Sequence, residues 1–180
     1  MRKEIKEIVI VPEGIEIETK DRVLSIKKEG KGTAKRYKGF DVKKEDNKII
    51  LYNNKATKKE KKLLKSFAAH FRNIIKGLQE KYVYQLKVCF VHFPVTLELK
   101  GNELLVKNFL GEKIPRKVKI SPDVDFKLEK DLITITSWDK EKAGQTAASI
   151  ESLTKIRNRD RRVFQDGIFI IKKAKGRTEK

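Results

Sequence analysis

The sequence predicts an α+β fold built as a tandem duplication of one small unit. Two stretches of helical periodicity, near residues 57–78 and 139–154, each follow two short alternating segments joined by a tight turn. The segments upstream of the two helical stretches also match each other in pattern. Each unit should therefore be a mostly antiparallel β-sheet packed with one amphipathic α-helix.

The first unit shows a hairpin followed by a helix. Residues 40–45 and 48–52 read as two strands joined by a turn at Asp46-Asn47. Thr57 and Glu60 then have the spacing of a capping box at a helix start. Apolar residues at intervals of three and four predict the buried stripe of this helix: Leu63, Leu64, Phe67, Ala68, Phe71, Ile74, Ile75 and Leu78.

The second unit repeats this arrangement. Residues 124–129 and 132–136 read as strands joined at Lys130-Asp131, and Asp139 is placed to cap the helix that follows. A buried row is expected at Ala143, Ala147, Ile150 and Thr154. The small residues Ala143, Gly144, Ala147 and Ala148 should let this helix approach its sheet closely.

The match between the copies continues upstream. Residues 15–18 resemble residues 95–98, and residues 23–26 resemble residues 104–107. Gly30 and Gly111 each open a return strand in this comparison. We therefore expect a first α/β repeat unit at residues 1–82 and a second at residues 83–180, with a basic C-terminal segment and little flexible linker between the units.

The composition points to a polyanionic partner. The 180 residues include 44 Lys and Arg against 25 Asp and Glu, a formal net charge of +19 at pH 7. Such charge opposes compaction by self-repulsion, which a nucleic acid would relieve, with an anionic membrane surface as the second candidate. The 38% hydrophobic share is enough for a core, and no apolar run is long enough to span a bilayer. A soluble cytoplasmic protein is expected.

The sequence shows no catalytic or cofactor-binding pattern. The single cysteine, Cys89, cannot form an internal disulfide or a zinc site and is expected in the core. His70 and His92 lack partners at metal-ligand spacing and are expected to be structural or exposed. The segment 30–35 lacks phosphate-loop spacing and reads as a hairpin turn. No cofactor and no metal are expected.

Basic residues concentrate in the second unit's C-terminal part and in one loop. Arginine is favoured at RNA contacts because its planar fork binds phosphate in a bidentate manner. The candidate RNA-binding residues are Arg157, Arg159, Arg161, Arg162, Lys172, Lys173, Lys175 and Arg177, with Lys113, Arg116 and Lys117 around Pro115. A solvated helix end remains the alternative for the C-terminal group. A lysine run at residues 55–65 is equally compatible with a solvated helix face.

Three segments carry a resemblance to a known family. Residues 151–170, the Ala143–Ala148 stretch before them, and residues 77–96 with His92-Phe93-Pro94-Val95 resemble the archaeal and eukaryotic branch of ribosomal protein six of the large subunit. The most specific motifs are Gly144-Gln145 and Phe164-Gln165-Asp166-Gly167. The bacterial branch has a Pro-rich, Gly-Lys-Gly segment after its helix, where this chain has residues 161–167.

The resemblance implies a structural constituent of the large ribosomal subunit and not an enzyme. Members are tandem duplications that bind large-subunit (23S-type) rRNA near the stalk base, close to where translational GTPases dock. The second copy makes much of that contact, which agrees with the basic residues above. Neighbouring ribosomal proteins are further implied partners, and no membrane or small-molecule substrate is implied.

Other functions remain open at this point. One is an assembly factor or RNA chaperone that acts outside the mature ribosome. Another is a nuclease that holds a metal with Asp123, Asp125 or Asp166. A protein of the membrane surface is a more distant alternative.

Overall fold

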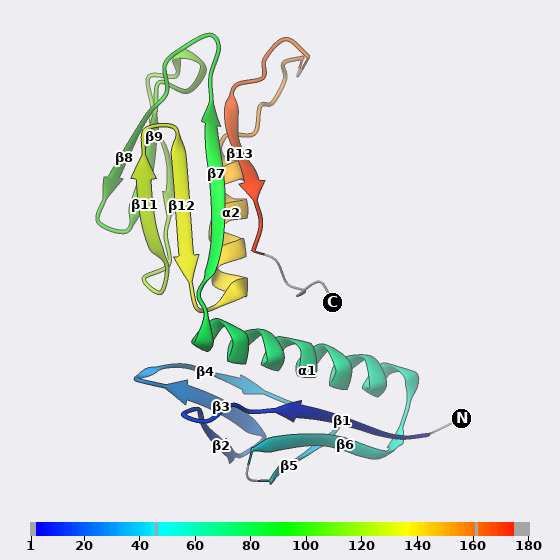
Figure 1. The fold of residues 1–180 in the computed structure, drawn as a ribbon. Helices are drawn as coiled ribbons and strands as arrows, with labels where there is room; N and C mark the ends of the chain where they lie inside the picture. The colour runs from blue at the N-terminus through cyan, green and yellow to red at the C-terminus, as the bar shows by residue number, and fades with distance from the viewer. Residues whose placement is uncertain (1–2, 46, 161, 175–180) are drawn as a thin grey trace. The chain divides into compact units, whose positions relative to one another are not determined.

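The chain divides into two compact units, Met1–Gln79 and Glu80–Lys180. The computed structural model describes residues 3–45, 47–160 and 162–174. Helices and antiparallel sheets make up both units, which confirms the predicted α+β class (Figure 1). The repeat boundary expected between residues 82 and 83 concerns the duplication itself and stays a prediction.

The first unit contains two three-stranded sheets and one long helix. Its sheets have the strand orders β1-β6-β5 and β2-β3-β4, and α1 packs against β1 and β6. The elements are β1 (Lys3–Ile10), β2 (Glu16–Lys20), β3 (Val23–Lys28), β4 (Lys31–Arg36), β5 (Asp41–Glu45), β6 (Lys48–Ala56) and α1 (Lys58–Gln79).

The second unit repeats this order and adds a final strand. Its sheets run β10-β9-β8 and β11-β12-β7-β13, and α2 covers one face of the four-stranded sheet (Figure 1). The elements are β7 (Tyr82–Cys89), β8 (Thr96–Lys100), β9 (Glu103–Lys107), a 3₁₀ turn at Phe109–Gly111, β10 (Arg116–Lys119), β11 (Asp125–Glu129), β12 (Leu132–Ser137), α2 (Lys140–Leu153) and β13 (Gly167–Lys172).

The strand pairings follow the predicted duplication. In each unit the first strand pairs with the last strand of a hairpin, β1 with β6 and β7 with β12. Both predicted hairpins are present, as β5–β6 and β11–β12. In the described part of the first unit no strand corresponds to β13, which pairs with the other edge of β7. Gly30 directly precedes β4, whereas Gly111 ends a 3₁₀ turn before the loop to β10.

The first helix is capped as predicted. Glu60 accepts a hydrogen bond from the Thr57 backbone amide at 2.7 Å, and Thr57 Oγ1 accepts from the Glu60 amide at 3.4 Å. Leu64, Ala68 and Phe71 are buried along the predicted stripe. Leu63 does not belong to that stripe, because 48% of it is exposed. Successive residues of a helix are rotated by about 100°, so Leu63 lies at the edge of the stripe that contains Leu64.

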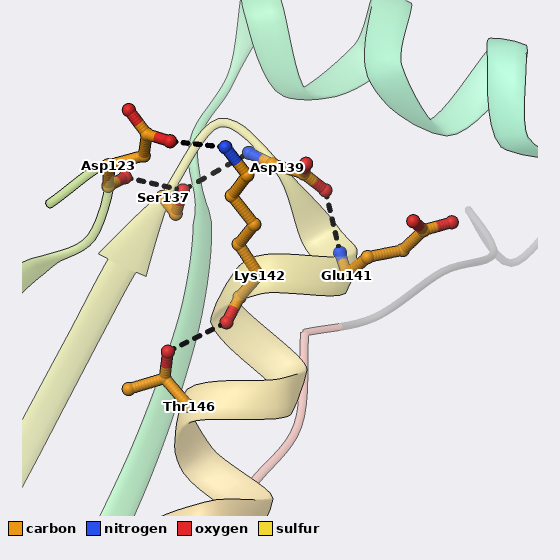
Figure 2. A network of polar contacts seen from close by, with 6 residues as sticks. All are labelled: Asp123, Ser137, Asp139, Glu141, Lys142 and Thr146. Carbon is orange, nitrogen blue, oxygen red and sulfur yellow. Dashed lines mark hydrogen bonds and ion pairs between the residues drawn. The ribbon is translucent and has the colours of Figure 1, made fainter. Parts of the chain in front are cut away.

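A polar network fixes the start of α2 (Figure 2). Asp139 accepts from the Glu141 amide at 2.8 Å, which confirms it as the N-cap. Ser137 Oγ accepts from the Asp139 amide and donates to the Asp123 carbonyl oxygen. Lys142 then pairs with the Asp123 carboxylate. Strand β12, the loop before β11 and the first turn of α2 are thereby joined.

Small side chains bring α2 close to its sheet. Ala143, Ala147 and Ile150 are fully buried, and Thr154 is nearly so, as the periodicity predicted. Gly144 lies over Tyr84, since a Cβ atom there would be 3.2 Å from the tyrosine hydroxyl oxygen. Burial raises the pKa of the Tyr84 phenol. Ala148 is exposed, so it does not contribute to the approach as expected.

The core of the second unit lies between α2 and its two sheets. It contains Leu86, Val106, Phe109, Ile133 and Ile168 among its buried residues. Within the described part of the chain, no helix is both long and apolar enough to cross a membrane.

Replacing Asp139 with Ala should lower the free energy of unfolding of the second unit by about 1 kcal/mol, because the first turn loses its cap. Urea unfolding followed by the fluorescence of Trp138, which is the only tryptophan and is buried, measures this change. Asp139→Asn keeps a capping oxygen and serves as the control. Equal losses in both variants would mean that the cap does not carry the effect.

Candidate nucleic-acid interface

The predicted arginines lie on a loop, not on a helix. Residues 154–166 form the arginine loop, which connects α2 to β13. Arg157, Arg159 and Arg162 are exposed on this loop. Arg161 lies outside the described residues. The Asp160 carboxylate accepts from the Arg162 amide at 2.9 Å, while its carbonyl oxygen accepts from the amides of Val163 and Phe164. These bonds hold the loop in a compact turn with its guanidinium groups outward.

The C-terminal end of α2 anchors the strand that follows this loop. Thr154 Oγ1 accepts from the Ile168 amide at 2.9 Å, and the Glu151 carboxylate accepts from the Ile170 amide at 3.1 Å. Thr154 is buried, so its bond is shielded from water. The loop is therefore fixed at both ends by the helix that precedes it.

A buried carboxylate ties this loop to a second one. The Asp166 side chain has no exposed surface, and its oxygens accept from the backbone amides of Val91 and His92 at 3.1 and 3.4 Å. Its Oδ1 atom also lies 3.2 Å from His92 Nδ1. Asp166 joins the end of the arginine loop to the segment after β7, so its place is structural rather than at the surface.

An aromatic stack extends from this anchor toward the surface. The His92 ring stacks on Phe164 with 4.8 Å between the ring centroids. The Arg159 guanidinium lies over the same phenylalanine ring, 4.8 Å from its centroid. A guanidinium over an aromatic face keeps its in-plane N–H groups available for a phosphate. His92 and Phe164 are not among the RNA-binding residues predicted from the sequence, because that set contains only Lys and Arg.

Arg116 is engaged inside the unit. Its Nε and Nη2 atoms donate to the two carboxylate oxygens of Glu112, and Nη1 donates to the Leu153 carbonyl oxygen at 2.6 Å. Its guanidinium lies 4.4 Å from the centroid of the Phe109 ring. The hydrogen bonds from Arg116 hold the pKa of Glu112 below its ordinary value. Arg116 thus joins the loop before β10 to the C-terminal end of α2, where the helix dipole is negative.

A basic hollow lies where these elements meet. It has a volume of about 430 Å³. Arg157, Arg159 and Arg116 of the predicted set line it together with Lys155, which the prediction omitted. Four cations face one carboxylate, and that carboxylate is already bonded to Arg116. Such a site favours an anion of the size of a phosphate group.

The other predicted residues that the structure describes do not line this hollow. Lys113 is exposed in the loop before β10, and Lys117 is exposed on that strand. Lys172 and Lys173 are exposed at the end of β13 and just after it. Lys175 and Arg177 lie outside the described residues. RNA contact by each of these residues stays a prediction.

The three carboxylates considered for a nuclease are each bonded within the second unit. Asp123 pairs with Lys142 (Figure 2), Asp125 pairs with Lys81 at 2.6 Å, and Asp166 binds backbone amides. In the described ranges, no three His, Cys, Asp or Glu side chains are grouped so that they could hold a metal. These carboxylates are used in contacts within the unit, and the basic side chains of the hollow are the candidate binding groups.

Comparison with known proteins gives consistent matches. A family model for ribosomal protein L6 matches residues 93–167. The chain is 34% identical to the large ribosomal subunit protein uL6 of Methanococcus vannielii, over 94% of both chains. It is 36% identical to the uL6 protein of Methanosarcina mazei, over 97% of this chain and 100% of the relative. The identity to the Archaeoglobus fulgidus uL6 protein is 41%, over 77% of this chain and 70% of the relative.

Replacing Asp166 with Ala should loosen the arginine loop and destabilise the second unit by about 1 to 3 kcal/mol, because two amides lose their acceptor. Limited trypsin digestion should then cleave faster at Arg157 and Arg159, and urea unfolding should shift to lower concentration. The control is Glu129→Ala, which removes an exposed carboxylate of the same unit on strand β11, outside the loop. Equal trypsin sensitivity of the two variants would contradict the anchoring role.

Proposed function

Because this chain belongs to the family of large ribosomal subunit protein uL6, we propose that it is a structural constituent of the large ribosomal subunit that binds 23S-type rRNA through its second unit. The family is one of ribosomal proteins, so the chain is not an enzyme. Its place is in the cytoplasmic ribosome. The observation that carries the proposed binding mode is the basic hollow with the arginine loop beside it.

Electrostatics and geometry both favour RNA as the ligand. The net charge of +19 supplies a general attraction to phosphates. Arg157 and Arg159 supply planar forks that bind phosphate oxygens in pairs. Helical RNA is read mostly by shape, phosphates and 2′-hydroxyls across its shallow minor groove. A fixed loop of arginines on a packed unit is suited to that kind of recognition, since the folded rRNA presents a single shape.

The proposed position within the subunit rests on the family resemblance. We place the chain near the stalk base, close to where translational GTPases dock, with neighbouring ribosomal proteins as further partners. The RNA-facing residues in this proposal are Arg157, Arg159, Arg161, Arg162, Lys172, Lys173, Lys175, Arg177, Lys113 and Lys117. Arg116 has a supporting role, because its three bonds hold the wall of the hollow.

The alternative is an RNA-binding assembly factor outside the mature subunit. Sucrose-gradient fractionation of native lysate separates the two. A structural constituent is expected in salt-washed large subunits at about one copy per subunit. Recovery only in the free fraction or on precursor particles would instead favour the assembly factor.

Replacing Arg157, Arg159 and Arg162 with Ala should weaken binding to large-subunit rRNA and flatten its salt dependence. The slope of log K against log salt should fall by about 0.7 to 0.9 for each phosphate that the variant no longer neutralises. Filter binding to purified large-subunit rRNA of Methanococcus vannielii, at several salt concentrations, measures both quantities.

Two controls accompany this measurement. Lys100→Ala, Lys127→Ala and Lys130→Ala together remove three exposed charges from other loops and strands of the second unit. Their combined effect gives the cost of net charge alone. Arg→Lys changes at the three loop positions keep the charge, so they should retain the slope and lose affinity. If the Arg→Ala loop variant and the triple lysine variant show equal slopes, the loop arginines are solvated and do not contact phosphates.

A further inference from the structure

A second hollow in the same unit adjoins the basic one and differs from it in chemistry. It is an open groove of about 1000 Å³ between the ends of β7 and β13 and the C-terminal end of α2. Ser152, Lys155 and Ile156 line both hollows, so the two are adjacent. Aromatic side chains line the larger groove: Phe90, Phe164 and Phe169.

Two of these phenylalanines are unusually accessible. Phe90 is 41% exposed and Phe169 is 44% exposed, although both are large apolar residues. The Phe169 ring lies against Gly167, where a Cβ atom would come within 3.0 Å of it. The absence of a side chain at Gly167 therefore lets the ring lie over the strand. Cys89 is half-buried and also lines this groove, so its predicted core position was wrong.

Some polar groups of the groove are bonded within the unit, and others can contact a ligand. The carboxylates of Glu151 and Asp166 are already bonded to backbone amides of the unit. Gln165 lines the groove with an amide that can donate and accept, and Asp131 adds an acceptor. Lys87 and Lys155 are exposed at the groove, where they can neutralise a phosphate. Aromatic faces, a few hydrogen-bonding groups and cations are together the features that bind an unstacked nucleotide.

We propose that this groove holds an unpaired nucleobase of the bound rRNA, stacked on Phe90 or Phe169, while the adjoining basic hollow holds the neighbouring phosphate. The inference rests on the proposed rRNA-binding function and deepens it. Binding by the arginine loop alone would depend on shape and phosphate, whereas a seated base adds a contact at one defined nucleotide. A groove lined by aromatic rings beside a hollow of four cations is suited to holding both parts of one nucleotide.

Affinity measurements separate stacking from charge. Phe90→Ala or Phe169→Ala, whichever removes the ring that stacks on the base, should weaken binding to the Methanococcus vannielii large-subunit rRNA by about 5-fold to 100-fold, with the salt slope unchanged. Phe90→Leu or Phe169→Leu, at that same position, keeps an apolar side chain without an aromatic face and should lose most of the same affinity. Phe93→Ala is the matched control, since Phe93 is 44% exposed and lies outside the groove. Trp138 fluorescence checks folding of each variant.

Chemical probing identifies the nucleotide. Base-specific reagents on the rRNA should show one or a few unpaired nucleotides whose reactivity changes with the wild-type protein and with Phe93→Ala. The change should be absent with Phe90→Ala or Phe169→Ala. If the groove variants match the control in affinity and footprint, the nucleobase proposal fails, while loss of binding in the arginine variants would still support the proposed function.

A crosslink tests whether a protein occupies the groove instead. A benzophenone amino acid at position 169, in chain assembled into large subunits, should crosslink to rRNA on irradiation. Crosslinking to a ribosomal protein would overturn the nucleobase proposal. If the wild-type chain bound no rRNA at any salt concentration, both the proposed function and this inference would fall together.

Discussion

The buried Asp166 carboxylate is the contact on which the candidate interface of the second unit depends. Its oxygens hold the segment at Val91 and His92 against the start of β13, although the two are far apart in the chain. Without that bond His92 would no longer be held against Phe164. The ring stack beneath the Arg159 guanidinium would then loosen. A carboxylate without exposed surface is costly unless its oxygens are bonded. Both oxygens meet that condition here, so the charge can rigidify the loops.

The second constraint is repulsion among the cations that this framework brings together. Arg157, Arg159 and Lys155 share one small hollow, where like charges oppose one another. The Glu112–Arg116 pair offsets part of that repulsion, and Arg116 also meets the carbonyl end of α2. Glu112 and Arg116 thus stabilise the fold around the hollow. The other three cations can therefore be held close together. A polyanion then gains a site that is already arranged, which lowers the ordering cost of binding.

Sequence patterns predicted the local structure well and the interface only in outline. The hairpins, the Thr57–Glu60 capping box and the Asp139 cap follow from neighbouring residues, and all are present. Arg116 differs, because its partner Leu153 is distant in the sequence and contributes a carbonyl oxygen that no sequence pattern displays. Cys89 was misjudged because alternation shows which side chains share a face but not which face is covered.

The candidate binding features gather in the second unit, and the difference between the two units gives a structural reason. Both have the same strand order and one helix, but only the second adds a described loop and strand after its helix, residues 154–166 and β13. That addition extends the sheet beside β7 and brings the arginines, Phe164, Asp166 and Phe169 in one continuous segment. The repeated framework supplies the rigid support, since Thr154 and Glu151 of α2 hold the added strand. A duplicated fold can thus acquire an interface by extension, with its core pairings retained.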